Sequence, residues 1–132
     1  MTIDLSNKAA VVTGAASGIG YAISTALKAS GASVCMSDVQ PDALKESIAG
    51  LDVIDGRAIT CVADVSDSKQ VRKMGETAAR ELGTIDILIN CAGLQSVSSL
   101  EKFPLEHWAR LLNVMLRGSF LCTQQFLPGM MS

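Results

Sequence analysis

The sequence TGAASGIG (13–20) places three glycines directly between an apolar run and a segment with helical periodicity. The run that leads into it, KAAVVTG (8–14), has the near-continuous apolar character of a buried strand. In the segment after it, apolar residues recur at the spacing of one helix face: Ile19, Ala22, Ile23, Ala26 and Leu27. A strand, a glycine-rich turn and a helix in this order predict the start of a βαβ unit.

The alternation of strand and helix continues over the rest of the chain. Further strands are predicted at 33–38, 57–64 and 85–93, and further helices from Pro41, at 66–82 and at 104–127. Short connections between alternating elements favour parallel strands joined by right-handed crossovers. We therefore predict a single α/β domain: a Rossmann-type, doubly wound parallel sheet with helices on both faces.

The glycine-rich turn has the features that a bound diphosphate requires. Gly14 lies just past the strand and permits a tight turn, and Gly20 lets the helix pack closely on the sheet. The missing side chain of Gly18 lets a pyrophosphate approach the backbone, where the helix N-terminus offers free N–H groups. A P-loop would need GxxxxGK[ST], and both its lysine and its spacing are absent. A purely structural turn remains the alternative.

Asp38 ends the second predicted strand, 18 positions after Gly20. A carboxylate at this place can accept hydrogen bonds from the ribose hydroxyls of an adenine dinucleotide, and it would repel a 2′-phosphate. Ser17 occupies the position where a basic residue could bind that phosphate, and no lysine or arginine directly follows Asp38. These residues favour NAD as cofactor, with NADP as the lesser candidate. A solvated strand end or a helix cap is the alternative role of Asp38.

Composition excludes several classes of partner. The net charge is −2 and no run of basic residues is present, so we expect no nucleic-acid partner. The most apolar stretch, 111–127, is interrupted by polar residues and is too polar to span a membrane, and the N-terminus lacks a signal-peptide pattern. The four cysteines form no CxxC pair and there is one histidine, so we expect no metal site and buried, reduced thiols in a cytoplasmic protein.

Together these residues resemble the short-chain dehydrogenase/reductase family. TGAASGIG resembles its TGxxxGIG motif, ADV (63–65) resembles the Asp-Val after its third strand, and NCAG (90–93) resembles its NNAG, with Cys91 in place of the usual asparagine. The asparagine of LLNVMLRG, Asn113, matches the asparagine of the family's long helix. The resemblance covers nearly all of the 132 residues and implies an oxidoreductase that moves hydride between a nicotinamide cofactor and an alcohol or ketone substrate.

The resemblance also assigns roles to individual residues. The Asp64 carboxylate would meet the adenine amino group, and Asn113 would hold a water of a proton relay on its main-chain carbonyl. The implied cofactor-binding residues are Thr13, Gly14, Ser17, Gly18, Ile19, Gly20, Asp38, Val39, Asp64, Val65, Asn90, Ala92 and Gly93, and the one implied catalytic residue is Asn113. Simpler roles stay open: Thr13 and Asn90 could tie loops to strands, Asp64 could cap the next helix, and Asn113 could be a buried amide.

The family's reaction centre, a serine and a YxxxK pair, lies downstream of the long helix. The only tyrosine here is Tyr21, which is in the first predicted helix and is followed four positions later by Thr25. We therefore expect residues 1–132 to be a single NAD(P)-binding Rossmann domain that is truncated after the fourth βα unit, incomplete at its C-terminus and inactive alone. The alternative is a non-catalytic protein that binds dinucleotide weakly or acts by protein association.

The predicted helix at 104–127 is apolar around most of its circumference. Leu112, Leu116 and Phe120 lie on one side, and Met115 and Cys122 lie on another. One side can pack on the sheet, whereas the other needs a second cover: a partner subunit in a homo-oligomer, or the thicker core of a longer protein. Because uncovered apolar side chains forfeit stabilisation comparable to that of a whole domain, we expect the isolated chain to be marginally stable, aggregation-prone or partnered.

Overall fold

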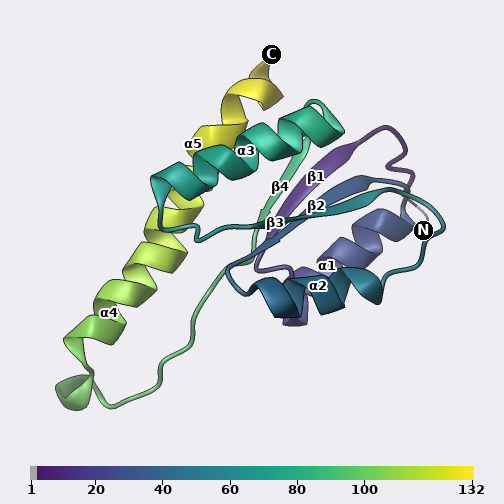
Figure 1. Cartoon of the computed structure of the whole chain (residues 1–132). Coiled ribbons are helices and arrows are strands. Elements are labelled where there is room, and N and C mark those ends of the chain that lie inside the picture. The colour runs from purple at the N-terminus through teal and green to yellow at the C-terminus, as the bar shows by residue number, and fades with distance from the viewer. Residues whose placement is uncertain (1–2) are drawn as a thin grey trace.

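The computed structural model describes residues 3–132, which form a parallel sheet between two layers of helices (Figure 1). The strands are β1 (Ala9–Thr13), β2 (Ser33–Asp38), β3 (Ala58–Val62) and β4 (Ile87–Asn90). The helices are α1 (Gly18–Ala29), α2 (Pro41–Ala49), α3 (Ser68–Leu82), the 3₁₀ turn η1 (Leu100–Lys102), α4 (Leu105–Leu111), the π-helical segment η2 (Leu112–Arg117) and α5 (Gly118–Met131). The strand order is β3-β2-β1-β4, with every pairing parallel, and this confirms the predicted α/β architecture.

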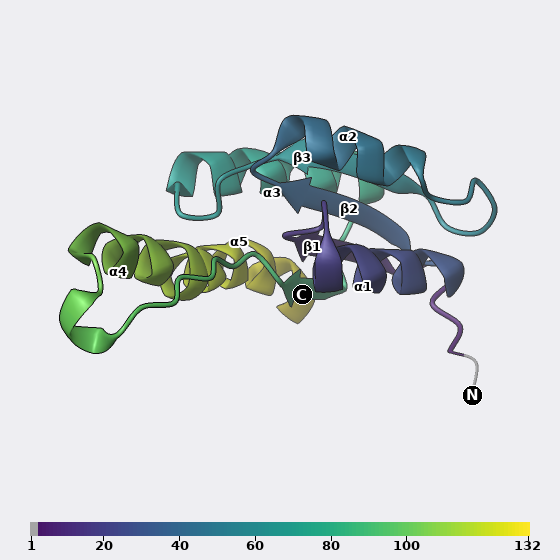
Figure 2. The ribbon, with the colours of Figure 1, turned by 90° about the horizontal axis from the view of Figure 1, so that it is seen from below.

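Each face of the sheet has its own apolar core, because successive strand residues point to opposite sides. In β1, Val11 belongs to the core under α3 and α5, whereas Val12 belongs to the core under α1 and α2 (Figure 2). The largest buried partners on the first side are Met74 and Phe126, and those on the second side are Met36 and Leu44. Burial of both faces explains why the strands are apolar along their whole length.

The face that α1 buries differs from the predicted one. Ile19, expected to face the core, is 75% exposed, and the buried residues of the helix are Gly20, Ser24 and Lys28. A Cβ on Gly20 would overlap the Gly14 carbonyl group, so the close approach at this glycine sets which side of the helix meets the sheet. Lys28 follows on the same side at i+8, and its ammonium group donates a hydrogen bond of 2.6 Å to the Ile54 carbonyl.

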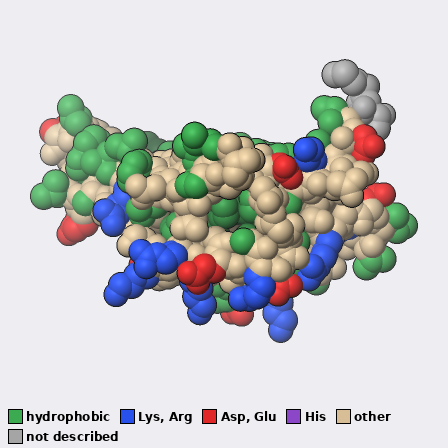
Figure 3. Space-filling model, turned by 90° about the horizontal axis from the view of Figure 1, so that it is seen from above, with side chains coloured by type: hydrophobic (Ala, Val, Ile, Leu, Met, Phe, Trp, Pro, Cys, Tyr) green, Lys and Arg blue, Asp and Glu red, His purple; other side chains and the backbone are tan. Residues whose placement is uncertain are grey.

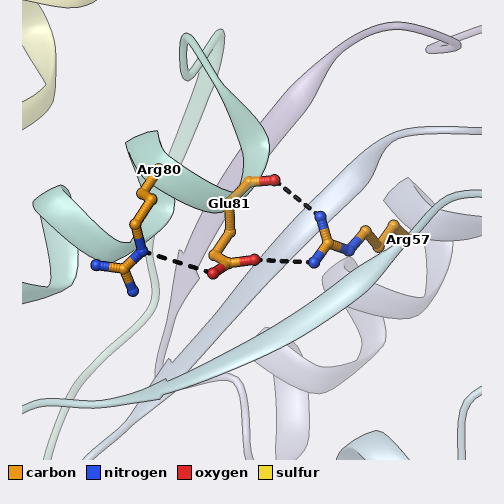
Figure 4. A network of polar contacts seen from close by, with 3 residues as sticks. All are labelled: Arg57, Arg80 and Glu81. Carbon is orange, nitrogen blue, oxygen red and sulfur yellow. Dashed lines mark hydrogen bonds and ion pairs between the residues drawn. The ribbon is translucent and has the colours of Figure 1, made fainter.

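The ends of α2 and α3 follow local signals in the sequence. Pro41 occupies the first turn of α2, where its missing N–H leaves no hydrogen bond unmade. The Asp67 side chain caps α3 by accepting hydrogen bonds from the N–H groups of Lys69 and Gln70. At the other end of α3, Glu81 pairs with Arg57 at 2.9 Å and with Arg80 at 3.6 Å (Figure 4). Arg57 also donates to the Glu81 carbonyl, and these exposed bonds fix the helix end against the start of β3.

The long C-terminal helix is continuous but not uniform. Predicted at 104–127, it runs through α4, η2 and α5, and the π-helical turn between them was not predicted. α5 reaches the core through Cys122 and Phe126, and Val114 of η2 packs against the same core, whereas α4 extends beyond the sheet (Figures 1 and 2). Hydrophobic side chains gather at that end of the molecule in Figure 3. Within residues 3–132, each helix is too short or too polar to cross a lipid bilayer.

Candidate functional site

A cleft of about 930 Å³ opens at the carboxyl ends of the strands. The chain leaves β1 toward β2 on one side of the sheet and returns on the other side as β4, so the cleft lies at a topological switch point, where open α/β sheets bind ligands. The sequence-predicted residues that line it are Gly14, Ser17, Ile19, Gly20, Asp38, Val39, Asp64, Val65, Ala92, Gly93 and Asn113. The predicted residues that lie outside this lining are Thr13, Gly18 and Asn90.

The glycines of the turn have different local surroundings. Gly14, with a φ of +63°, packs so closely on the segment after β4 that a Cβ would lie 2.8 Å from the backbone of Cys91 and Ala92. Gly18, with a φ of +57°, is open: apart from its chain neighbours and the backbone of its own helix, no described heavy atom lies within 4 Å of the place of its missing Cβ. Gly14 and Gly20 therefore hold the turn against the sheet, while Gly18 leaves a side of the turn free.

The start of α1 is not capped by a side chain. The Ser17 hydroxyl makes no cap hydrogen bond to the backbone of residues 3–132, in contrast to Asp67 at the matching position of α3. The first N–H groups of an uncapped helix carry a partial positive charge and remain available to an anion. An open glycine beside uncapped N–H groups forms a cradle that fits a diphosphate.

Asp38 braces the glycine-rich turn from the end of β2. One carboxylate oxygen accepts a hydrogen bond of 3.0 Å from the N–H of Ala16, and the other accepts one of 3.1 Å from the N–H of Gln40. Each carboxylate oxygen can accept a second bond, so both remain able to receive a hydroxyl from a ligand. The carboxylate thus lies at the cleft wall in a fixed position, next to the open turn.

The loop after β3 is held by both neighbouring helices. Asp64 accepts hydrogen bonds from the N–H and the hydroxyl of Ser66 at 2.9 and 2.7 Å. Arg117 donates from Nε to the Ser66 carbonyl at 3.1 Å, and Gly118 approaches Val65 so closely that a Cβ would lie 2.6 Å from its side chain. The suggestion that Asp64 caps the following helix is wrong, because Asp67 does so and Asp64 closes its own turn.

Thr13 and Asn90 lie behind the cleft lining and tie strands to loops. The Thr13 hydroxyl is buried and accepts hydrogen bonds from the N–H groups of Cys91 and Ala92 at 3.2 and 3.1 Å. The Asn90 amide donates a long hydrogen bond of 3.5 Å to the Thr123 hydroxyl. Thr13 therefore positions the segment after β4 that forms the cleft wall.

Asn113 lies at the start of the π-helical segment, on the wall of the cleft opposite the sheet. Its main-chain carbonyl accepts the N–H of Gly118, five residues later, instead of that of Arg117. The alternative of a buried structural amide is wrong, because Asn113 is exposed. π-Helical turns widen a helix locally and occur frequently at functional sites.

Ser37 was missed in the sequence and also lines the cleft. It is fully buried near the end of β2, and its hydroxyl has no hydrogen-bond partner within residues 3–132. The signal in the sequence was weak: a polar residue in the otherwise apolar strand SVCMSD, directly before Asp38.

All four cysteines are free thiols, and Cys35 and Cys122 are buried as predicted, whereas Cys61 and Cys91 are only half-buried. Burial raises the pKa of the Cys35 thiol to about 12, with a contribution from the neighbouring Cys61 thiol, and burial raises the pKa of Cys122 to about 11. These thiols stay protonated and inert near neutral pH. In the described part of the chain, no group of three or more His, Cys, Asp or Glu side chains is placed to hold a metal ion.

Comparison with known proteins gives consistent matches. The family model described as short chain dehydrogenase matches residues 8–132. An uncharacterized oxidoreductase from Bacillus subtilis, YxbG, is 37% identical over 128 residues, which are 96% of this chain and 47% of that protein.

Two solved structures superimpose closely on the chain. A short-chain dehydrogenase/reductase from Brucella melitensis, described as a glucose/ribitol dehydrogenase, has a TM-score of 0.92 and 30% identity, covering 98% of this chain and 54% of that one. L-Sorbose reductase from Gluconobacter frateurii, complexed with NADPH and L-sorbose, has a TM-score of 0.90 and 29% identity, covering 98% and 50%. The chain thus spans about half the length of each of these three relatives.

Proposed function

The chain belongs to the short-chain dehydrogenase family of NAD(P)-dependent oxidoreductases, and from this premise we propose that its cleft binds a nicotinamide dinucleotide with the diphosphate at the start of α1. The observation that carries the proposal is the open side of Gly18 beside the uncapped N–H groups of the helix. Diphosphates bind at such termini because the N–H groups and the helix dipole both favour negative charge.

The remaining cleft residues suit the rest of the dinucleotide. Asp38 can accept the adenosine ribose hydroxyls while keeping its bonds to the turn, and the fixed Asp64–Val65 loop can receive the adenine ring. Thr13 positions the segment after β4 through its hydrogen bonds, Ala92 and Gly93 extend the cleft wall toward Asn113, and Asn90 lies just outside that wall. Bound NAD(P) would supply the hydride chemistry.

We propose that the whole protein is an oxidoreductase acting on an alcohol or ketone, in which this chain contributes the dinucleotide site and Asn113. The family's serine and YxxxK pair do not occur in the sequence after Asn113, so we expect residues 1–132 alone to catalyse no hydride transfer. The exposed apolar side of α5 supports a second proposal, association through residues 104–127, with another subunit or with the rest of a longer chain. The free thiols suit a reducing compartment such as the cytoplasm.

The preference for NAD over NADP rests mainly on Asp38, together with Ser17 in the place of a basic residue and the lack of lysine or arginine directly after Asp38. Its carboxylate is held at the cleft wall by two backbone N–H groups, where it would repel a 2′-phosphate. The similarity to a reductase complexed with NADPH gives this preference no support, since both cofactors occur within the family. Asp38→Ala should shift the ratio of NADP to NAD affinity toward NADP by about tenfold, since about one charge interaction is removed. A wild-type chain that already binds NADP more tightly would overturn the preference.

A pair of matched glycine variants tests the proposed cofactor site. Gly18 and Gly83 both have a positive φ, of +57° and +78°, and both have open space where a Cβ would project. Valine should therefore strain the backbone at both positions, and more so at Gly83, whose ψ of −148° lies in a region that is essentially restricted to glycine, so Gly83→Val is the stricter control for strain. Only Gly18→Val should abolish binding of NAD in a calorimetric titration, because only Gly18 borders the cradle. Equal affinities of Gly18→Val and Gly83→Val would place the dinucleotide elsewhere.

A further inference from the structure

The Ser37 hydroxyl is the one buried side-chain polar atom without a hydrogen-bond partner within residues 3–132. The residue is 0% exposed, yet it lines the cleft. Buried hydroxyl groups in native proteins are nearly always hydrogen-bonded, because an unmade bond leaves the loss of hydration uncompensated. The Ser37 hydroxyl therefore keeps an unmade hydrogen bond that a molecule bound in the cleft can complete.

The position of Ser37 explains why the chain cannot satisfy it. Hydroxyls on helices bond to the carbonyl four residues earlier, as Ser24 does to Gly20 at 2.9 Å and Ser119 does to Met115 at 2.8 Å. A strand offers no such local acceptor, because its carbonyls point sideways into the sheet ladder. The Ser37 carbonyl itself accepts the N–H of Ala15, which draws the glycine-rich turn over the end of β2.

The neighbours of Ser37 across the sheet do not use its hydroxyl. Thr13 lies beside it in register on β1, and Cys61 lies beside it on β3. The Thr13 hydroxyl serves the N–H groups after β4, and the Cys61 thiol is a weak hydrogen-bonding group. Ser37 thus lies in the cleft floor between the strand ends that lead to the turn and to Asp64.

We propose that Ser37 is an additional cofactor-binding residue whose hydroxyl hydrogen-bonds the adenosine end of the dinucleotide. This inference rests on the proposed function of the cleft and assigns a contact within it. Asp38 follows directly on the same strand, the Asp64 loop continues the neighbouring strand, and Ser37 lines the same cleft, so Ser37 lies next to the residues assigned to ribose and adenine. A hydroxyl can donate or accept, and adenosine offers ribose hydroxyls and ring nitrogens as partners.

If Ser37 makes this contact, Ser37→Ala should stabilise the free chain but weaken its binding of adenosine-containing ligands. Without ligand, the hydroxyl is an unsatisfied buried group, so Ser37→Ala should raise the melting temperature of the free chain by a few degrees. With ligand, the hydroxyl gains its partner, so Ser37→Ala should weaken binding of ADP and of NAD by roughly fivefold. Binding of nicotinamide mononucleotide should be unchanged, because that half of the cofactor carries no adenosine.

The control is Ser33→Ala, since Ser33 begins the same strand, has the same side-chain direction and lies at the end away from the cleft. It should leave the ADP and NAD affinities unchanged. Unchanged ADP affinity in Ser37→Ala, with wild-type binding intact, overturns the Ser37 contact and leaves the cofactor site standing. A lower melting temperature of free Ser37→Ala would also overturn it, since the hydroxyl would then have a partner without ligand. A wild-type chain that binds neither ADP nor NAD overturns the site and the contact together.

Discussion

The β1–α1–β2 region and the long C-terminal helix are built from equally apolar sequence, but they bury it to very different degrees. All five residues of β1 are buried, and the turn after it is fixed by Asp38 and by the packing of Gly14 and Gly20. In α4, by contrast, every residue is exposed except the half-buried Leu111. In α5, Phe120 is 61% exposed although Phe126, less than two turns later, is 6% exposed.

The difference shows which region has its apolar surface covered by the described residues and which does not. The side of the fold around the glycine-rich turn has its apolar cover, the hydrogen bond from Ala16 to Asp38 and its close backbone contacts within the described residues. The outer side of the long helix, which includes Leu116, Phe120 and Leu127, has none of these within the described residues. A large exposed apolar patch on a soluble protein typically marks a surface that another segment or subunit covers.

The largest effect that would sharpen this comparison is expected at Gly20. In Gly20→Val the side chain would collide with the backbone of Gly14, so the turn and α1 cannot keep their places. We expect a loss of at least about 3 kcal/mol of unfolding free energy, or no soluble protein, in chemical denaturation. The control is Gly129→Val in α5, where no described heavy atom lies within 4 Å of the added Cβ. Comparable losses in the two variants would contradict the proposed tightness of the turn.

The second test compares two phenylalanines of one helix. Phe126→Ala removes a ring from the core under α3 and α5 and should lower the unfolding free energy by about 3–5 kcal/mol. Phe120→Ala removes an exposed ring and should change it by less than about 1 kcal/mol, while increasing solubility at high concentration. Thermal denaturation at low protein concentration separates the two. A large loss in Phe120→Ala would mean that α5 is already covered on its outer side in solution.

The buried Cys35 thiol of β2 should give a smaller, pH-dependent change in the unfolding free energy. The pKa of Cys35 is raised from 9.0 to about 12, so above pH 9 the unfolded chain releases a proton that the folded chain keeps. Stability should therefore fall as the pH rises from 9 toward 12, by up to about 1.4 kcal/mol per pH unit for this thiol. Cys35→Ala should show a shallower decline in urea denaturation at pH 8.5, 9.5 and 10.5. An identical slope in both proteins would show that the thiol titrates normally.

The smallest effects are expected at the two helix starts. Asp67→Ala removes the side-chain cap of α3 and should lower the melting temperature by roughly 2–6 °C. Ser17→Ala at the start of α1 should leave the melting temperature of the free chain unchanged, because its hydroxyl caps nothing in the described backbone. A clear loss in Ser17→Ala would mean that the α1 terminus is closed and not open to an anion.

Much of the architecture could be predicted because it depends on local signals. Pro41 opened a helix, Asp67 capped one, and the apolar runs became buried parallel strands. The side of α1 that faces the sheet could not be predicted from periodicity. The apolar stripe included Ile19, but the contact between Gly20 and Gly14 turned the helix so that Ser24 and Lys28 became buried.

At the candidate site, the motifs correctly indicated the positive φ of Gly18 and the carboxylate of Asp38 at a strand end, whereas the binding of a cofactor by these residues stays a prediction. Ser37 was not predictable, because a serine in a strand has no distinguishing pattern until its missing partner is seen. The same applies to the π-helical turn at Asn113, since a change in hydrogen-bond spacing leaves the order of apolar residues unaltered.

That turn has a consequence for how the long helix is aligned. In an α-helix each residue advances the side-chain direction by about 100°, and a π-helical turn holds one residue more than an α-helical turn. The segment from Leu112 to Arg117 therefore lets Asn113 lie on the cleft wall while Cys122 and Phe126 still meet the sheet. The π-helical turn therefore rotates the faces of α4 and α5 relative to each other. Deleting one residue from Leu112–Arg117 would rotate one of the two helices so that Asn113 and Phe126 could no longer both keep their places.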